Sequence, residues 1–214
     1  MNKNISNLHL GILDEQRREL LDKLQPFIKG FVLGGGTALA LQLNHRRSFD
    51  FDFFSSSPVA NNHLEKLSQS LTVKSVAVDT ADELTFFTDS DIKVTFLYYP
   101  FNHTFPLIDI GEGLNLFSVK DIAIKKAYTI GRRGEYRDYF DLYTILKGGY
   151  LGLPELTSLT KEVYGGIFSE KNLLSQLVYF DDLLNFEIIP ATSSQLPQPE
   201  EVKSFFEELV QKTV

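Results

Sequence analysis

The amino-acid sequence predicts a mixed α/β (α+β) fold, in which a β-sheet core flanked by helices is followed by a C-terminal helical region. Short runs rich in β-branched and aromatic residues indicate strands in the first half of the chain, at residues 31–33, 49–54, 73–78, 84–88 and 92–99. Apolar residues then recur every three or four positions, which predicts helices at residues 118–130, 135–147, 154–164, 169–184 and 199–212. We therefore expect an α/β core over residues 1–117 and a helical region over residues 118–214.

Helices are also expected within the first half of the chain. Apolar residues separated by charged ones predict an amphipathic helix over residues 9–28. A second helix is expected over residues 38–44, with Thr37 as its N-cap, and a third over residues 61–70.

The boundary between the two expected parts has its own signals. Residues 102–113 have the composition of a loop. Ser118 stands three residues before Asp121 and ahead of an apolar run, which is the spacing of a capping box at the start of a helix.

Composition excludes several classes of protein. Hydrophobic residues make up 43% of the 214 residues and charged residues 23%, as in ordinary folded domains. No cysteine is present, so disulfides and thiolate metal sites are excluded. The net charge of −7 argues against a general nucleic-acid-binding surface. No apolar run approaches the roughly 20 residues that span a bilayer, and no signal-peptide segment begins the sequence, so we expect a cytoplasmic protein without membrane contact.

The segment GGGTALALQLNHRRSFDFDFF, residues 34–54, places two carboxylates in an apolar strand. Side chains at positions i and i+2 of a strand point to the same face, so Asp50 and Asp52 share one face. Phe49, Phe51 and Phe53 are expected on the opposite face, in the core. Two adjacent carboxylates repel one another unless a cation lies between them, and Mg²⁺ prefers such oxygen ligands.

The glycines of the same segment indicate a second kind of site. They lead into a helix N-terminus, where backbone N–H groups and the helix dipole favour a phosphate. Glycine triplets also occur in ordinary turns, and the two aspartates could instead contact solvent or the neighbouring Arg46 and Arg47. The combination and order of these features favour a functional site.

These residues carry a family resemblance. A glycine pair, a helix and an Asp-x-Asp strand look like the signature of the polymerase-beta-like nucleotidyltransferase superfamily, and the whole segment more closely resembles the AbiEii/AbiGii toxin family of nucleotidyltransferase-like proteins. DIKVTFLYYPF, residues 91–101, resembles a late strand of that family. SVKDIAIKKAYTIGRRGEYRDYFDLYTIL, residues 118–146, resembles its second conserved block. The resemblance covers about residues 30–150 and implies a nucleotidyltransferase-like mixed sheet.

The resemblance implies roles for the residues of the first block. The nucleotide phosphates would be held by Gly35, Gly36 and Thr37, where Thr37 replaces the more usual serine. Asp50 and Asp52 would hold Mg²⁺ or Mn²⁺. The resemblance also implies phosphate contacts for two residues beside them, Arg47 and Ser48; for Arg47, a solvated surface charge is an equal alternative.

In the second block, the resemblance assigns catalytic positions to Lys126, Asp138 and Asp141. Lys126 would act on a nucleotide phosphate as a point charge. Asp138 and Asp141 are neighbours on one helix, because they are three residues apart. Their alternative role is to pair with arginines and fix the packing of the helices.

The sequence departs from the superfamily at one place. A third carboxylate is usual on a neighbouring strand, but Thr95 occupies the corresponding position. Asp91 has the same strand parity but lies four residues away. Three alternatives follow: one metal ion suffices, Asp138 or Asp141 completes the site, or catalysis is weakened.

The expected function is metal-dependent transfer of a nucleoside monophosphate from a nucleoside triphosphate to an acceptor hydroxyl of RNA, such as a tRNA end, or of a protein. By resemblance, the protein would be the toxin of a type IV toxin–antitoxin or abortive-infection system, with a cognate antitoxin as partner. One alternative is a catalytically inactive module that binds a nucleotide or a partner. Another is a phosphotransferase that acts on small molecules such as aminoglycosides.

Overall fold

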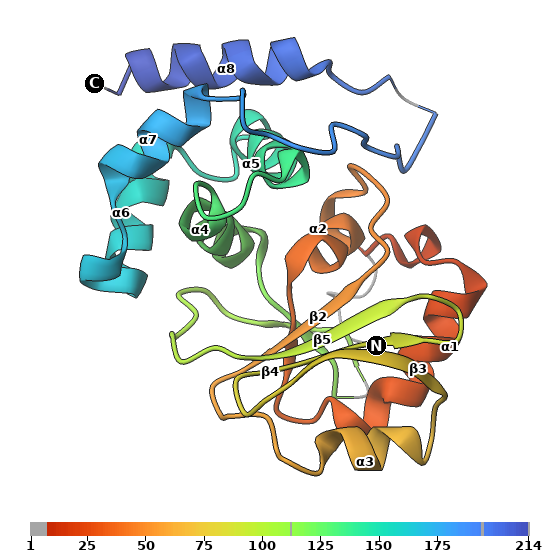
Figure 1. Ribbon diagram of the computed structural model, residues 1–214. Coiled ribbons are helices and arrows are strands. Elements are labelled where there is room, and N and C mark those ends of the chain that lie inside the picture. The colour runs from red at the N-terminus through yellow and green to blue at the C-terminus, as the bar shows by residue number, and fades with distance from the viewer. Residues whose placement is uncertain (1–7, 112, 194, 214) are drawn as a thin grey trace. The chain divides into compact units, whose positions relative to one another are not determined.

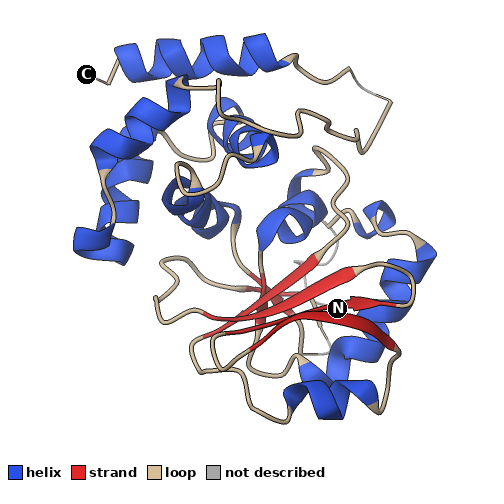
Figure 2. Cartoon of the chain, viewed as in Figure 1, coloured by secondary structure: helices blue, strands red, loops and turns tan. Residues whose placement is uncertain are grey.

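The computed structural model describes residues 8–111, 113–193 and 195–213. It has the mixed α/β fold that the sequence predicts (Figure 1, Figure 2). The chain forms two compact units. The first unit comprises the chain up to Asn102 together with Pro106–Phe117, and the second comprises His103–Phe105 and the chain from Ser118 onward.

The first unit is built on a mixed β-sheet. Its strands are β1 (Val32–Leu33), β2 (Phe51–Ser55), β3 (Val73–Asp79), β4 (Glu83–Thr88), β5 (Lys93–Tyr98), β6 (Ile108–Asp109) and β7 (Asn115–Leu116). Within the described residues they form one seven-stranded sheet in the order β3-β4-β5-β2-β1-β7-β6. Strand β2 runs parallel to β5 and antiparallel to β1, and β1 runs parallel to β7. The other neighbouring pairs are antiparallel.

Helices of the first unit lie on both faces of this sheet (Figure 1). They are α1 (Glu15–Leu24), α2 (Gly35–Leu43) and α3 (His63–Ser68). Phe53 and Phe96 are fully buried on one face, and the ring of His63 in α3 lies 4.5 Å from the ring of Phe96. Asp52 points to the opposite face, against the N-terminus of α2. The sheet therefore separates an aromatic core from the face that carries the aspartates.

The second unit consists of helices around an aromatic core. Its helices are α4 (Val119–Thr129), α5 (Tyr136–Lys147), α6 (Leu153–Tyr164), α7 (Glu170–Val178) and α8 (Pro199–Gln211). Helix α4 packs on α5 and α6, while α8 packs on α5 and α7. Tyr139 is fully buried and contacts the rings of Phe180 and Phe206. No helix in the described part of the chain is long and apolar enough to cross a bilayer.

The start of the chain corrects two expectations. The single helix predicted over residues 9–28 is divided: α1 is flanked by 3-10 turns at Leu10–Ile12 and Gln25–Phe27. Pro26 lies in the second turn, where its missing N–H ends regular helical hydrogen bonding. Thr37 is not the N-cap of α2, because Gly34 takes that position and the helix begins at Gly35.

Other boundaries differ where long-range contacts decide the structure. Phe49 was expected in the core but is 38% exposed, because β2 begins only at Phe51. The expected loop over residues 102–113 contains β6, whose two residues are too few to show a pattern. The helix expected over residues 169–184 ends at Val178. The capping box is confirmed, since the Ser118 side chain accepts a hydrogen bond from the Asp121 N–H.

Candidate active site

The first turn of α2 is formed by glycines. Gly35 has a φ of +64°, in the left-handed region that favours glycine. The N-cap residue, Gly34, has no side chain to accept hydrogen bonds from the first N–H groups of the helix. A helix N-terminus of this kind presents backbone donors and the positive end of the helix dipole, which together suit an anion.

The Asp52 side chain lies directly on this turn. The Gly34 N–H donates a hydrogen bond of 2.9 Å to the Asp52 backbone carbonyl, which ties the turn to β2. A Cβ atom at position 35 would overlap the Asp52 carboxylate oxygen Oδ2. Glycine at this position therefore allows a carboxylate to reach the helix N-terminus.

Asp50 lies just before β2, on the face that alternation gives to Asp52. Its carboxylate oxygen Oδ2 lies 3.5 Å from the Lys93 Nζ atom on the adjoining strand. Both side chains are about one-third exposed, at 31% for Asp50 and 33% for Lys93. The contact is loose and open to solvent, so it costs little to exchange for another cation.

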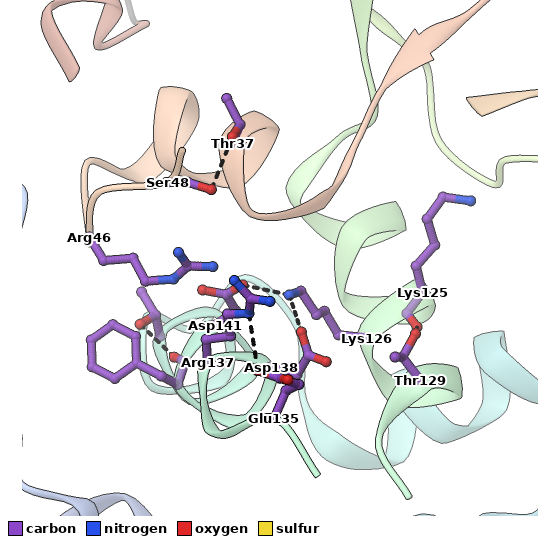
Figure 3. A network of polar contacts seen from close by, with 12 residues as sticks. Thr37, Arg46, Ser48, Lys125, Lys126, Thr129, Glu135, Arg137, Asp138 and Asp141 are labelled. Atoms are coloured by element: carbon purple, nitrogen blue, oxygen red, sulfur yellow. Dashed lines mark hydrogen bonds and ion pairs between the residues drawn. The ribbon is translucent and has the colours of Figure 1, made fainter. Parts of the chain in front are cut away.

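Thr37 and Ser48 connect α2 to the segment before β2 (Figure 3). Thr37 is buried, and its Oγ1 atom lies 3.0 Å from Ser48 Oγ. The same hydroxyl contacts the Asp50 backbone carbonyl. Thr37 therefore holds the Asp50 backbone and Ser48 against the helix, at the place where the resemblance implies phosphate contacts.

Arg46 was not among the site residues predicted from the sequence. It is only 6% exposed, whereas its neighbour Arg47, which was selected, is exposed. A Cβ atom at Gly36 would overlap Arg46 Nη2, so the guanidinium lies against the first turn of α2. The Asp52 carboxylate lies on the same turn, so an anion is present beside this cation at the positive end of the helix dipole. Neighbouring arginines in a loop carry no sequence signal that distinguishes the buried one.

Thr95 lies beside Asp52, where the resemblance led us to expect a third carboxylate. The register of β2 and β5 pairs Asp52 with Thr95. Thr95 is 5% exposed. Asp91 lies in the turn before β5, where its carboxylate is 2.6 Å from Lys74 Nζ. The neighbouring strand therefore presents a hydroxyl beside Asp52.

The residues selected in the second block lie together in the second unit (Figure 3). Lys126 on α4 places its Nζ atom 2.6 Å from Asp138 Oδ1 and 2.6 Å from Asp141 Oδ2, both on α5. Arg133 donates two hydrogen bonds to Asp138, of 2.7 and 3.0 Å. Lys126, Asp138 and Asp141 are almost fully buried. We call these four side chains the α4–α5 ion cluster.

Burial and charge act in opposite directions on this cluster. Burial alone would raise the pKa of Asp138, but the charges of Lys126 and Arg133 outweigh burial, so the pKa is lowered. Asp138 is therefore ionised at neutral pH. One residue before Lys126, burial lowers the pKa of Lys125 to about 6 despite the nearby Asp121 charge.

The carboxylates of the first unit would fit a metal ion that takes its remaining ligands from outside the protein. In the described part of the chain, no group of three or more histidine, aspartate or glutamate side chains could hold a metal ion. Asp50 and Asp52 supply two carboxylates, and Mg²⁺ or Mn²⁺ commonly takes one or two carboxylates with water and substrate phosphates in its other positions. The set is thus too small for a closed, all-protein metal site.

Comparison with known proteins gives the family. Residues 19–212 match the family model described as "Nucleotidyl transferase AbiEii toxin, Type IV TA system". An uncharacterized protein of Aquifex aeolicus (strain VF5) is 32% identical over 212 residues, covering 94% of this chain and 97% of that protein.

Two solved structures are also similar. The crystal structure of a "putative nucleotidyltransferase from H. pylori" has a TM-score of 0.54 at 20% identity, covering 94% of this chain and 95% of that one. The Megavirus polyadenylate synthase has a TM-score of 0.44 at 17% identity, covering 62% of this chain and 31% of that one. The likeness to the H. pylori structure shows the fold of a nucleotidyltransferase, and the match to the family model shows that the chain belongs to the AbiEii nucleotidyltransferase toxin family.

Proposed function

We propose that this chain transfers a nucleoside monophosphate from a nucleoside triphosphate to an acceptor hydroxyl. The observation that carries the proposal is the position of the Asp52 carboxylate on the first turn of α2. A carboxylate that can bind a hard cation therefore lies next to backbone N–H groups that can bind phosphate. A triphosphate that carries a metal ion needs both kinds of group close together.

In this proposal, the backbone at Gly35 and Gly36 binds the triphosphate. Arg46, packed on the same turn, adds a positive charge beside the proposed phosphate site. Arg47 and Ser48 remain candidates for phosphate contacts at the edge of this site. Thr37 acts as a positioning residue, since its hydroxyl is used to hold Ser48 and the Asp50 backbone.

Asp50 and Asp52 would hold Mg²⁺ or Mn²⁺ through their carboxylate oxygens. Such an ion supplies Lewis-acid stabilisation of the charge on the phosphates. The backbone at Gly35 and Gly36 and the neighbouring side chains keep the triphosphate aligned, so that the acceptor oxygen attacks the α-phosphorus opposite the bond to the leaving pyrophosphate. The acceptor loses its proton, and the pyrophosphate leaves with the electron pair of the broken bond.

The α4–α5 ion cluster has a different part in the proposal. Lys126 has a carboxylate at 2.6 Å on each side, which supports a role in fixing α4 against α5. We propose that Lys126, Asp138 and Asp141 serve the reaction as positioning residues, by holding this helix pair in one arrangement.

The family description supports a biological role as the toxin of a type IV toxin–antitoxin system. We infer that the acceptor is RNA, such as a tRNA end, or a protein hydroxyl. A cognate antitoxin would be the protein partner, and the cytoplasm, where nucleoside triphosphates are available, would be the location.

The test compares D50N with the unaltered chain. Each protein is incubated with Mg²⁺, the four α-³²P-labelled nucleoside triphosphates and total bacterial RNA or protein. We expect label transfer by the unaltered chain and a loss of at least about 100-fold in D50N. D79N, which alters an exposed aspartate at the end of β3, is the matched control and should retain activity. Full activity of D50N would refute the assignment.

A second candidate function is a nucleotide- or partner-binding module without turnover. The observation that favours it is the pairing of Asp52 with Thr95 in place of a third carboxylate. Calorimetry with ATP, GTP, CTP and UTP, with and without Mg²⁺, separates the two functions. Binding without any release of pyrophosphate over long incubation would favour the module.

A further inference from the structure

A buried pair of threonines crosses the sheet beside Asp52. Thr85 of β4 pairs with Thr95 of β5, and their hydroxyl oxygens lie 3.1 Å apart. Thr85 and Thr95 are 7% and 5% exposed. The Thr85 hydroxyl also lies 2.6 Å from Glu83 Oε1. Three side chains on two strands thus form a continuous line of short polar contacts.

The protons in this line have a direction. Each threonine hydroxyl carries one proton, and an ionised carboxylate can only accept. The shorter contact is therefore Thr85 donating to Glu83. The Thr85 proton is then used, so the 3.1 Å contact is Thr95 donating to Thr85. The Thr95 oxygen is left as the accepting end of the line, with the Glu83 carboxylate at the other end.

The accepting end lies beside the proposed catalytic aspartate. Asp52 and Thr95 are paired residues on neighbouring parallel strands, which are about 4.8 Å apart. Val94 and Phe96, on either side of Thr95, are fully buried in the core, so Thr95 points to the aspartate face. A hydroxyl that approaches Asp52 can therefore donate to Thr95.

We propose that Glu83, Thr85 and Thr95 form a proton relay that takes the proton of the attacking hydroxyl. The inference rests on the proposed nucleotidyl transfer. As the acceptor oxygen bonds to the α-phosphorus, its proton passes to Thr95, the Thr95 proton passes to Thr85, and the Thr85 proton passes to Glu83. The bond from the α-phosphorus to the pyrophosphate breaks, and the proton is released from Glu83 to solvent after the transfer.

Two features argue for a relay over simple pairing of buried hydroxyls. Two threonines alone satisfy one another across a sheet and require no carboxylate. Glu83 is only half-buried, and so retains the contact with solvent that is needed to discharge a proton. A carboxylate at position 95 would lie on β5, next to Asp52. Through the two threonines, the Glu83 carboxylate is connected to the same place from β4, one strand further away.

Three variants test the relay. E83Q keeps an oxygen that can accept from Thr85 but cannot take up the proton, so the geometry is preserved while the base is removed. T95V removes the accepting end. T95D in the E83Q background places a carboxylate directly beside Asp52 and should make Glu83 dispensable. T88V is the control, because it removes another buried hydroxyl from β4 outside the line.

The assay measures kcat and KM for transfer of labelled nucleotide to total bacterial RNA or protein, and calorimetry measures nucleotide affinity without acceptor. Since a positioned base contributes roughly 100- to 10,000-fold, we expect E83Q and T95V to lose at least about tenfold in kcat, with nucleotide affinity unchanged. T95D/E83Q should recover most of the lost turnover, and T88V should match the unaltered chain.

The remaining outcomes overturn the relay. Glu83 does not act as the base if E83Q keeps full turnover. The same conclusion follows if E83Q loses nucleotide affinity by the same factor as turnover, or if T95D/E83Q recovers no turnover. If E83Q and T95V keep full turnover while D50N abolishes transfer, the relay is wrong and the nucleotidyl transfer stands. If the unaltered chain transfers no nucleotide, both proposals fail together.

Discussion

Substitution of Asp138 by asparagine should strongly destabilise the second unit. Lys126 is 8% exposed at its side chain and lies 2.6 Å from Asp138, which is 1% exposed. Removing one partner of a buried ion pair leaves a desolvated charge with reduced compensation. Arg133 also loses its ion pair with Asp138, but its side chain is 53% exposed, so solvent screens that part of the effect.

The magnitude follows from the burial of the pair. Breaking a buried pair from one side costs about 3–5 kcal/mol, and 1 kcal/mol lowers the melting temperature by roughly 2–4 °C in a chain of this size. D138N should therefore melt about 6–20 °C below the unaltered chain. E208Q, which removes an exposed pair with Lys212, is the matched control and should cost at most about 0.5 kcal/mol.

The same variant has a signature in its pH dependence. The folded-state pKa of Asp138 is lowered, although burial alone would raise it, because Lys126 and Arg133 favour the ionised form. The stabilisation is therefore complete above the unfolded-state pKa of about 3.9 and is lost as the pH falls from there through the folded-state pKa. The unaltered chain should lose stability more steeply in this window than D138N.

Differential scanning calorimetry at neutral pH and along an acid series measures both effects. Equal melting temperatures for D138N and E208Q would refute the reasoning, since a buried and an exposed ion pair would then be equivalent. Parallel acid limbs for D138N and the unaltered chain would show that Asp138 does not contribute to the acid sensitivity.

Two further predictions concern the first turn of α2 and its attachment to β2. G35A should destabilise the first unit by about 1–3 kcal/mol and weaken nucleotide binding, because its Cβ would overlap Asp52 at a positive φ; G30A, at φ +85° in open space, isolates the cost of the φ angle alone. T37V should cost about 1–3 kcal/mol, because it leaves the Asp50 carbonyl without a buried donor, whereas T144V loses only a bond to its own helix. Urea denaturation measures the free energy of unfolding of each variant and its control. Equal losses for G35A and G30A, or for T37V and T144V, would contradict the assigned contacts.

Local sequence patterns predicted the features that depend on near neighbours. Alternation placed Asp52 on the face opposite Phe51 and Phe53, and a three-residue spacing identified the Ser118 cap. The helix predicted over residues 9–28 was too long, because the apolar periodicity continues past Leu24 although Pro26 interrupts the helical hydrogen bonds.

Contacts between distant segments were outside the reach of such patterns. The burial of Arg46 depends on how the segment before β2 folds back on Gly36, and no local pattern separates Arg46 from Arg47. The line from Glu83 to Thr95 depends on the register of β4 and β5. A slip of one residue in this register would turn every side chain to the opposite face of the sheet. From the sequence alone, Thr95 is therefore recognisable only as a residue that stands where a carboxylate is usual.

The two groups of aspartates differ in charge balance, and this difference separates their roles. In the α4–α5 ion cluster, Lys126 and Arg133 supply two positive charges for the two negative charges of Asp138 and Asp141, all at 2.6–2.7 Å. A metal ion could bind there only by displacing buried partners, which is costly. Asp50, by contrast, is 31% exposed with Lys93 at 3.5 Å, so a divalent cation can replace that contact. This difference supports the proposals that Asp50 helps to hold the metal ion and that Asp138 and Asp141 act as positioning residues.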